Sequence, residues 1–421
     1  MDQQRPQHAL VVGQGSREHA LVYSLTESKH FSKVYAAPGN PGIAGLAECI
    51  AYQNLPELIS WCAKREPLLV IIGPEAPLVA GLADALRSQG HWVVGPSQAA
   101  AALEGSKTYA KEVMRRYNIP TARAQMARTP AQLQAWIEEE TMWPHVMKQS
   151  GLAGGKGVVI VDSREAAWHV AESWTERPEL FDEGILWEEC LIGEEISVHV
   201  LTNGHEYAWL PLTRDYKRVN ARSDAPNTGG MGAFGPVPGL DPETKDRINK
   251  EILDPVMQFL RDERMLYRGV LYVGLMLTAS GPQVLEFNVR MGDPETEVIV
   301  PMVEQDWGAL WMQLAQGRLP RIADHFGKAA VAVVLADERY PNPTTGGQPL
   351  HIPQNLDGLV FQGATRLVDG VLEGNGGRIL TVVGVGPDVS NARRQAYQVM
   401  SQIDAPGTQY RQDIALEHRD S

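Results

Sequence analysis

GLAGGKGV, residues 151–158, is a glycine-rich stretch with one lysine that fits neither of the two common nucleotide-binding loops. A P-loop needs Ser or Thr directly after its lysine, because that hydroxyl binds magnesium, whereas Gly157 follows Lys156 here. A dinucleotide-binding turn leads into a helix, whereas VVIVD (158–162) is β-branched and typical of a strand. HVMK (145–148) is also apolar and strand-like. We therefore expect a glycine-rich flap between two antiparallel strands, with an ordinary long hairpin as the alternative.

The composition limits the class of protein. The chain has 421 residues, enough for two to four domains that each bury a core. Apolar residues make up 43% and charged residues 21%, and the net charge of −13 argues against a binder of nucleic acid or membrane surfaces. The 3 cysteines have no CxxC spacing, which favours a reducing cytoplasm over a zinc site or a disulfide framework. The start MDQQRPQ does not resemble a signal peptide, and no apolar run is long enough to span a membrane. We expect a cytoplasmic protein with no membrane or nucleic-acid partner.

The first hundred residues alternate short apolar strands with helices. Strands are predicted at 8–13, 33–39, 68–73 and 91–97, and helices from about Arg17 and over 82–90. This alternation is typical of a doubly wound parallel sheet with helices on both faces. Ligands of such sheets bind beyond the carboxyl ends of the strands, where the turns GQGSRE, PGNPG and GPEAP lie.

The character of the chain changes near Glu104 and again near Gly327. The middle region holds the glycine-rich hairpin, several longer strands and a long polar loop at 215–232. Loops of that length are usually functional or disordered. Beyond Gly327 the chain is rich in strands and ends in a predicted helix at 391–403. We expect α/β and α+β domains at 1–103, 104–326 and 327–421.

A run of polar residues on one strand predicts a metal site. QVLEFNVR (283–290) is strand-like, and the period of two places Glu286, Asn288 and Arg290 on the same face. A carboxylate and an amide oxygen suit a hard cation such as Mg²⁺, which completes its shell with nucleotide phosphates. A neighbouring arginine can stabilise charge on a transferring phosphoryl group. The alternative is a solvated edge strand.

Three lysines extend this pattern towards a triphosphate. Lys107 opens a predicted helix, Lys148 ends the strand before the glycine-rich loop, and Lys156 lies within the loop. Lysines on one side of the phosphates and metal ligands on the other side would suit a nucleotide bound between two sheets. The strand ILWEEC (185–190) ends in two glutamates, where a backbone hinge could read the edges of adenine.

These motifs make a family resemblance specific. The chain resembles the ATP-grasp ligases and, within them, the phosphoribosylamine–glycine ligase family, the glycinamide ribonucleotide synthetases. The similarity runs from about residue 8 into the C-terminal region. It is carried, in the family's order, by GQGSREHAL, APGNPG, GPEAPLVAG, GSKTYAK, GLAGGKGV, DYKR, PNTGGMGA, EFNVRMGDPET and NGGRIL. Nine motifs in this order argue against a Rossmann dehydrogenase.

The resemblance implies a fold and a reaction. It implies an N-terminal α/β substrate-binding domain, an ATP-grasp domain with a small flap subdomain at about 122–191, and a C-terminal mixed α/β domain. The implied reaction is ATP-dependent ligation of glycine to 5-phosphoribosylamine in purine biosynthesis, through glycyl phosphate, giving glycinamide ribonucleotide, ADP and phosphate. The implied cofactors are ATP and Mg²⁺ or Mn²⁺. The expected partners are the two substrates and a transient contact with the upstream amidotransferase, in a monomer or small homo-oligomer.

The resemblance also implies roles for individual residues. The expected catalytic residues are Arg290, Lys148 and Asp293, and the expected metal ligands are Glu286 and Asn288. The residues expected to bind ATP are Lys107, Lys148, Gly154, Gly155, Lys156, Gly157, Glu188, Glu189, Leu191 and Glu195. Those expected to bind glycine and phosphoribosylamine are Gly15, Arg17, Glu75, Asp215, Lys217, Asn227, Thr228, Gly229, Gly230 and Glu295. Two of these have plainer alternatives, since Glu75 could be an acidic turn residue without a partner and Arg17 could cap the sheet.

Some positions depart from the family's pattern. Gln14 opens the first turn, Cys190 replaces the usual aromatic after the hinge glutamates, and Tyr216 replaces the usual His before Lys-Arg. Tyr216 and the altered turn favour a paralogous ATP-grasp ligase with another amino acid or amine. A nucleotide-binding regulatory protein without turnover is a further alternative, against which Glu286, Asn288 and Arg290 argue. We expect Tyr216 to face solvent and glycine to remain the substrate.

Overall fold

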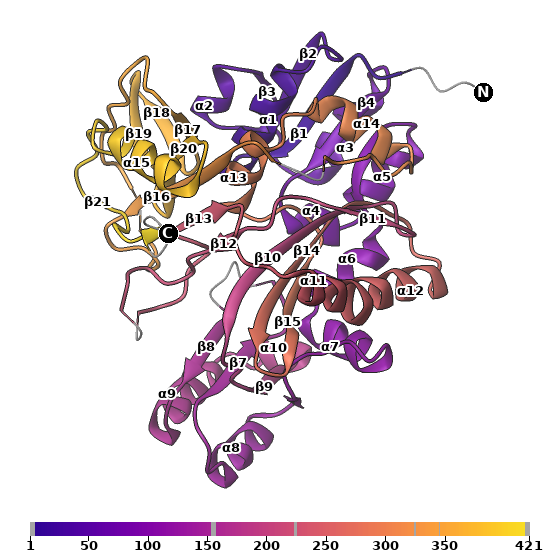
Figure 1. Ribbon diagram of the computed structural model, residues 1–421, viewed down its shortest axis with the longest axis vertical. Coiled ribbons are helices and arrows are strands. Elements are labelled where there is room, and N and C mark those ends of the chain that lie inside the picture. The colour runs from indigo at the N-terminus through magenta and orange to yellow at the C-terminus, as the bar shows by residue number, and fades with distance from the viewer. Residues whose placement is uncertain (1–4, 153–156, 223–224, 324–325, 345, 417–421) are drawn as a thin grey trace.

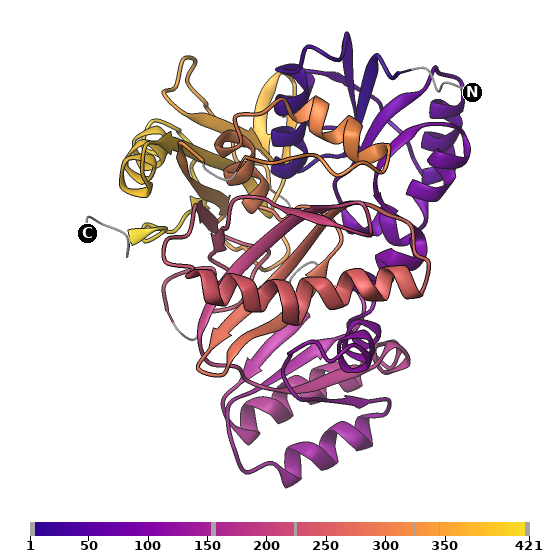
Figure 2. The ribbon, with the colours of Figure 1, turned by 45° about the vertical axis from the view of Figure 1, so that its right-hand side comes forward.

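The computed structural model describes residues 5–152, 157–222, 225–323, 326–344 and 346–416. Three large sheets organise this part of the chain (Figure 1). The N-terminal strands and their helices lie at the upper right in that view, the C-terminal strands at the upper left, and a small sheet at the bottom. Turning the molecule by 45° leaves the small sheet projecting below the rest (Figure 2).

The largest sheet has nine strands and joins the N-terminal region to the middle of the chain. Its strands are β1 (His8–Gly13), β2 (Lys33–Pro38), β3 (Glu48–Cys49), β4 (Leu68–Ile72), β5 (Trp92–Pro96), β10 (Glu194–Thr202), β11 (Tyr207–Trp209), β14 (Tyr267–Thr278) and β15 (Gly281–Asn288). The N-terminal strands pair in parallel in the order β5-β4-β1-β2-β3. β14 then pairs antiparallel with β5, β10 and β15. Strand pairing therefore continues across the expected boundary near residue 103.

The parallel strands are buried on both faces, as their apolar sequences predict. Leu10 and Val12 pack with helices on one face, and Ala9 and Val11 pack with helices on the other. These helices are α1 (Ser16–Thr26), α2 (Pro41–Ala44), α3 (Leu55–Ala63), α4 (Glu75–Val79), α5 (Leu82–Ser88), α6 (Gln98–Gly105) and α14 (Trp307–Ala315). The doubly wound N-terminal sheet predicted from the sequence is confirmed.

A four-stranded antiparallel sheet forms the small projecting unit. Its strands are β6 (Ala124–Ala127), β7 (His145–Gln149), β8 (Val158–Val161) and β9 (Ile185–Glu189), with helices α7 (Lys107–Arg116), α8 (Pro130–Glu139), α9 (Arg164–Thr175) and α10 (Glu179–Glu183) nearby. β7 pairs antiparallel with β8, so the hairpin expected around GLAGGKGV is present. Residues 153–156, between the two strands in sequence, lie outside the described chain.

The six-stranded sheet mixes C-terminal strands with two strands from the middle of the chain. These are β12 (Arg214–Asp215) and β13 (Gly232–Gly235), together with β16 (Ala329–Asp337), β17 (Leu359–Gln362), β20 (Arg378–Gly386) and β21 (Thr408–Gln409). β13 pairs with β16, and α15 (Val389–Met400) packs on β16 and β20. β18 (Thr365–Val368) and β19 (Val371–Gly374) form a separate hairpin. The polar loop expected at 215–232 is thus held at both ends by the C-terminal sheet.

Further helices cover the antiparallel strands. α11 (Pro242–Ile248), a π-helical turn (Asn249–Leu253) and α12 (Asp254–Asp262) follow one another, and their apolar residues join the core of β14. α13 (Glu295–Met302) is buried between α1 and the C-terminal sheet. The fold class predicted from the sequence is confirmed, a mixed α/β chain with an N-terminal parallel sheet and a C-terminal strand-rich region. The domain boundaries themselves stay a prediction.

Candidate functional site

A cavity of about 440 Å³ lies between the four-stranded sheet and β14–β15 and reaches the C-terminal sheet. It brings together residues that are far apart in the sequence. The predicted site residues that line it are Arg17, Glu75, Lys107, Lys148, Gly157, Glu188, Glu189, Leu191, Glu195, Asp215, Lys217, Asn227, Thr228, Gly229, Glu286, Asn288, Arg290, Asp293 and Glu295. Two others, Gly15 and Gly230, do not line it. Gly154, Gly155 and Lys156 lie outside the described residues.

A buried carboxylate holds two lysines at the end formed by the small sheet. Glu188, only 2% exposed, pairs with Lys148 at 2.9 Å and with Lys111 at 3.3 Å. Lys148 also donates to the backbone oxygen of Leu285 at 3.2 Å. Burial lowers the pKa of Lys111 to about 8, although Glu188 opposes the shift. Lys111 was not predicted as a site residue; its position four residues after Lys107, on the same helix face, was the available signal.

Lys107 is the cation of this cavity most available to a ligand. Its side chain donates to the backbone oxygen of Gly151 at 3.1 Å, and within the described chain its amine makes no ion pair. The side chain of Ser106 caps the helix that Lys107 begins, because its oxygen accepts from the N–H of Tyr109. Burial lowers the pKa of Lys107, and Glu286 opposes this. A partly buried lysine at a helix N-terminus, with no carboxylate partner among the described residues, is suited to an anionic group.

Apolar side chains form the rest of this end. Met114, Met276, Leu285 and Phe287 line it, along with other apolar residues of β7 and β9. The predicted hinge residue Glu189 turns its carboxylate to Arg123, with 2.9 Å between Oε2 and the arginine Nε. An apolar slot bordered by backbone groups of a strand end can hold a planar ring. The apolar lining was not predicted, because alternating apolar residues on strands are equally typical of core.

The two predicted metal ligands lie side by side on β15. Asn288 Nδ2 is 3.5 Å from Glu286 Oε1, so the two side chains share a face of the strand as expected. Burial raises the pKa of Glu286, but Lys217, Lys107 and Lys148 outweigh it and hold the pKa below its usual value. The described residues contain no cluster of three or more His, Cys, Asp or Glu placed to hold a metal ion. The amide oxygen of Asn288 accepts from Arg290 NH2 at 3.2 Å. A charged carboxylate and an amide on one face of a strand nevertheless fit a cation that takes few protein ligands and the rest from phosphates.

Arg290 is fixed between two acidic residues. Its NH2 lies 2.7 Å from Glu104 Oε1, and its Nε lies 3.3 Å from Glu75 Oε2. Glu104 also accepts from the backbone N–H of Val289 at 2.8 Å, so it holds the arginine and the strand end together. Burial lowers the pKa of Arg290, but Glu104 and Glu75 outweigh it, so the guanidinium stays charged. Glu104 was not predicted as a site residue; it lies in α6, whose sequence gives no sign of this contact.

The opposite end of the cavity is a dense group of charges. Lys217 pairs with Glu195 and lies 4.0 Å from Glu286. Burial raises the pKa of Asp215 to about 8 even though Lys217 opposes the shift. Ser197 donates to Glu295 at 3.2 Å and shares a 3.1 Å hydrogen bond with the hydroxyl of Tyr272, which also lines the cavity. This arrangement offers both signs of charge to a small zwitterion.

Tyr216 takes no part in lining the cavity. The backbone N–H of Ala415 donates to its hydroxyl at 2.9 Å, and Arg411 lies over its ring at 5.0 Å. The side chain is half-buried against the C-terminal segment, so the expectation that it faces solvent is wrong. The apolar face of the ring packs with the core of the C-terminal sheet, which a sequence reading of the loop alone could not reveal. Cys190, in contrast, does line the cavity.

The N-terminal turn closes the cavity from the side of the parallel sheet. The backbone N–H of Gly15 donates to Glu18 Oε2 at 2.7 Å, and Arg17 pairs with the same carboxylate at 2.6 Å. Arg17 also donates to the backbone oxygen of Met291 at 3.3 Å. Arg17 therefore links the turn to the loop after β15 and also lines the cavity.

Family models match nearly the whole chain. They are described as phosphoribosylglycinamide synthetase, N domain (residues 7–104), ATP-grasp (A) domain (105–296) and C domain (330–417). A phosphoribosylamine–glycine ligase from Caldanaerobacter subterraneus is 38% identical over 96% of this chain and 99% of its own. Another, from Ralstonia nicotianae, is 40% identical over 96% of this chain and 98% of its own.

Solved structures agree with these matches. The crystal structure of phosphoribosylamine–glycine ligase from Thermotoga maritima has a TM-score of 0.84 and 35% identity, covering 97% of this chain and 100% of its own. A biotin carboxylase domain from Hydrogenobacter thermophilus, solved with MgADP and bicarbonate, has a TM-score of 0.75 at 15% identity, covering 97% of this chain and 92% of its own. The second likeness shows a shared fold. Within the described chain, no helix combines the length and apolar character needed to cross a membrane.

Proposed function

The chain belongs to the phosphoribosylglycinamide synthetase family, and from this premise we propose that it joins glycine to 5-phosphoribosylamine at the expense of ATP. The products are glycinamide ribonucleotide, ADP and phosphate, and the reaction belongs to purine biosynthesis. The observation that carries the proposal is the cavity itself, in which an apolar slot, a pair of oxygen ligands and a charged pocket follow one another.

ATP would occupy the end formed by the small sheet. The apolar slot near Met276 and Phe287 takes the adenine ring, and Lys107 with Lys148 takes the phosphates. Glu286 and Asn288 would hold Mg²⁺ or Mn²⁺, which supplies charge neutralisation for phosphates in transfer. The expected flap residues 153–156 lie outside the described chain, so the contribution of Lys156 is a proposal from the sequence.

Glycine would bind between the ATP phosphates and the charged pocket. Asp215 and Glu295 offer carboxylates to its ammonium group, and Lys217 offers a cation to its carboxylate. Asp215 has a raised pKa, and the ammonium group of bound glycine would favour its charged form. This placement leaves the glycine carboxylate oxygen free to attack the γ-phosphate, giving glycyl phosphate and ADP. The protein needs to supply no covalent nucleophile, because positioning and charge stabilisation suffice.

Phosphoribosylamine would approach from the side of the N-terminal turn and Asp293. Its amine attacks the acyl carbon of glycyl phosphate, and phosphate leaves as the C–N bond forms. Arg290, held by Glu104 and Glu75, is placed to stabilise charge on the departing phosphate. We also propose that the chain is divided into domains at 1–103, 104–326 and 327–421. It would act as a monomer or small oligomer and make transient contact with the amidotransferase.

Phosphate release tests this function. Wild-type protein with ATP and Mg²⁺ should release phosphate at a sustained rate only when glycine and phosphoribosylamine are both present. Alanine or β-alanine in place of glycine should be poor substrates, because a small pocket rejects added carbon atoms by roughly 1–3 kcal/mol or more. Equal use of a larger amino acid would point to the paralogous ligase. Tyr216, the residue that favoured that alternative, does not line the cavity.

A further inference from the structure

Arg378 is a residue of the C-terminal sheet that lines the cavity. It is the first residue of β20, and its side chain is 23% exposed and lines the cavity. The strand pairing places it opposite Ala336 at the end of the sheet that faces the middle of the chain. NGGRIL was recognised in the sequence as a motif without a role for its arginine.

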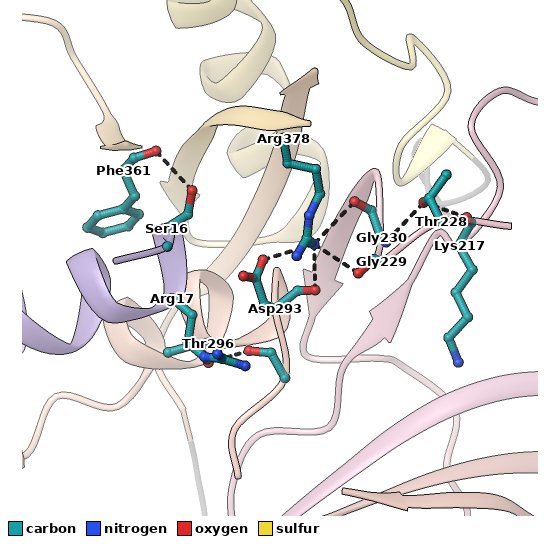
Figure 3. A network of polar contacts seen from close by, with 12 residues as sticks. Ser16, Arg17, Lys217, Thr228, Gly229, Gly230, Asp293, Thr296, Phe361 and Arg378 are labelled. Atoms are coloured by element: carbon teal, nitrogen blue, oxygen red, sulfur yellow. Dashed lines mark hydrogen bonds and ion pairs between the residues drawn. The ribbon is translucent and has the colours of Figure 1, made fainter. Parts of the chain in front are cut away.

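One nitrogen of Arg378 ties together two loops from the middle of the chain (Figure 3). NH1 donates to the backbone oxygens of Gly229 and Asp293, each at 2.8 Å, and lies 3.4 Å from that of Gly230. It also lies 2.9 Å from Asp293 Oδ1. Hydrogen bonds to backbone oxygens constrain the main chain of a loop directly, independently of its side chains. These bonds therefore set the position of both loops.

The two loops carry residues proposed to bind the substrates. The turn at 227–230 begins with Asn227 and Thr228, and Thr228 is held in turn by a 2.7 Å hydrogen bond to the backbone oxygen of Lys217. Asp293 precedes Glu295 at the start of α13. An ideal Cβ at Gly15, in the N-terminal turn, would lie 3.7 Å from Asp293 Oδ2. Three separate segments therefore meet around Asp293, which Arg378 contacts.

The loops approach so closely that only glycine fits between them. Gly230 has a φ of +117°, and a Cβ there would lie 2.6 Å from Pro294 Cδ and 3.2 Å from the backbone oxygen of Asp293. Tyr340, also from the C-terminal region, accepts from the N–H of Gly229 at 3.1 Å. The C-terminal region thus contacts this turn at an N–H, through Tyr340, and at its carbonyls, through Arg378. Within the described chain, Nε and NH2 of Arg378 make no hydrogen bond, so they are not needed to hold the loops.

We propose that Arg378 is a positioning residue for the phosphoribosyl end of the cavity, where it fixes the 227–230 turn against the Asp293 loop. This inference rests on the proposed function. It assigns to the C-terminal sheet a part in binding phosphoribosylamine and glycinamide ribonucleotide, whereas ATP binds at the opposite end and does not depend on Arg378.

The test uses the stable product glycinamide ribonucleotide and ATP with Mg²⁺ as separate calorimetric probes of the full chain. Arg378→Ala should weaken glycinamide ribonucleotide binding by on the order of 10- to 100-fold, as expected for losing hydrogen bonds to a charged group. Arg378→Lys keeps the charge, but its amine ends one bond short of the position of NH1 and cannot reach both loops, so binding should weaken by about tenfold. ATP binding should change by less than about twofold in both variants, since the sites are well separated.

Arg366→Ala is the matched control. Arg366 lies on β18, pairs with Glu373 and does not line the cavity, so its loss should leave both affinities unchanged. If Arg378→Ala does not fold, Arg378→Lys decides alone. Wild-type affinity for glycinamide ribonucleotide in Arg378→Lys, or an equal loss of both ligands, would overturn the proposal. A wild-type protein that binds neither probe and releases no phosphate would instead overturn the proposed function.

Discussion

At the scale of single residues, several cations of the cavity form ion pairs with carboxylates of the protein. Lys148 pairs with Glu188, Lys217 with Glu195, and Arg378 with Asp293. In a buried site each ion of such a pair has a partner that offsets part of its desolvation cost, which keeps both groups charged. The cations therefore stay fixed in position for phosphates and carboxylates. This preorganisation is the source of electrostatic stabilisation during transfer.

Among the residues of the cavity, we expect substitution of Glu286 to lower turnover most. Glu286→Gln keeps the shape of the side chain but removes the charge proposed to hold the metal. We expect turnover to fall by at least about 100-fold at ordinary Mg²⁺, since a bound metal contributes several kcal/mol of charge stabilisation. The melting temperature should stay near that of wild type. Steady-state phosphate release at increasing Mg²⁺ measures the effect, and partial recovery at high Mg²⁺ would support a metal role.

Glu251→Gln is a suitable control for that variant. Glu251 pairs with Arg247 at 2.8 Å within the helical segment over β14, remote from the cavity. Wild-type turnover in Glu286→Gln at ordinary Mg²⁺ would remove this carboxylate from the metal site.

The site residues that could be predicted from the sequence lie close together in the chain, whereas those that were missed contact distant segments. Glu286 and Asn288 share a strand, so the period of two was enough to place them together. Glu104 and Arg378 act on segments more than 80 residues away in sequence, through contacts that only the folded chain creates. A motif such as NGGRIL marked the position of Arg378 without indicating what it touches.

At the scale of secondary-structure elements, the short strands β12 and β13 decide how the substrate loop is held. They are too short for a periodicity to identify, and both belong to the C-terminal sheet although they lie in the middle of the chain. The long apolar strands were predicted correctly because their burial on both faces leaves a continuous apolar run. Helix α13 was missed, since its eight residues contain a proline and several β-branched side chains, which are more typical of a strand.

Buried in α13, Glu297 should limit stability at neutral and alkaline pH. Both of its carboxylate oxygens lack a hydrogen-bond partner within the described chain. Burial raises the pKa of Glu297 well above its usual value, Asp293 raises it further, and Arg378 and Arg17 oppose this. A raised carboxyl pKa means that the folded state holds the proton more tightly than the unfolded state. The resulting stability is present at acid pH and is lost as pH rises through the folded pKa.

Glu297→Gln should therefore raise the melting temperature by a few degrees at pH 8 and by less at pH 5. About 1 kcal/mol shifts the melting temperature by roughly 2–4 °C in domains of 150–250 residues, so the difference is measurable. Thermal unfolding followed at both pH values in wild type and variant checks this. An equal change at the two pH values would mean that the proton on Glu297 does not contribute.

At the scale of the whole molecule, contacts between the two ends of the chain enclose the substrate side of the cavity. The backbone N–H of Gln362 on β17 donates to His19 Nδ1 at 2.8 Å, and Ser16 donates to the backbone oxygen of Phe361 at 3.3 Å (Figure 3). Burial lowers the pKa of His19 to about 4, so its ring stays neutral and can accept this hydrogen bond at physiological pH. The N-terminal helix, the C-terminal sheet and the middle of the chain thus form one frame around the site.

The transfer of an oxygen atom from glycine to phosphate tests the central claim most directly. Glycine labelled with oxygen-18 in both carboxylate oxygens is incubated with the wild-type protein, ATP, Mg²⁺ and phosphoribosylamine, and the released phosphate is analysed by mass spectrometry. If the carboxylate attacks the γ-phosphate to form glycyl phosphate, each phosphate carries one labelled oxygen and the product amide keeps the other. Unlabelled phosphate formed in step with glycinamide ribonucleotide would contradict the account.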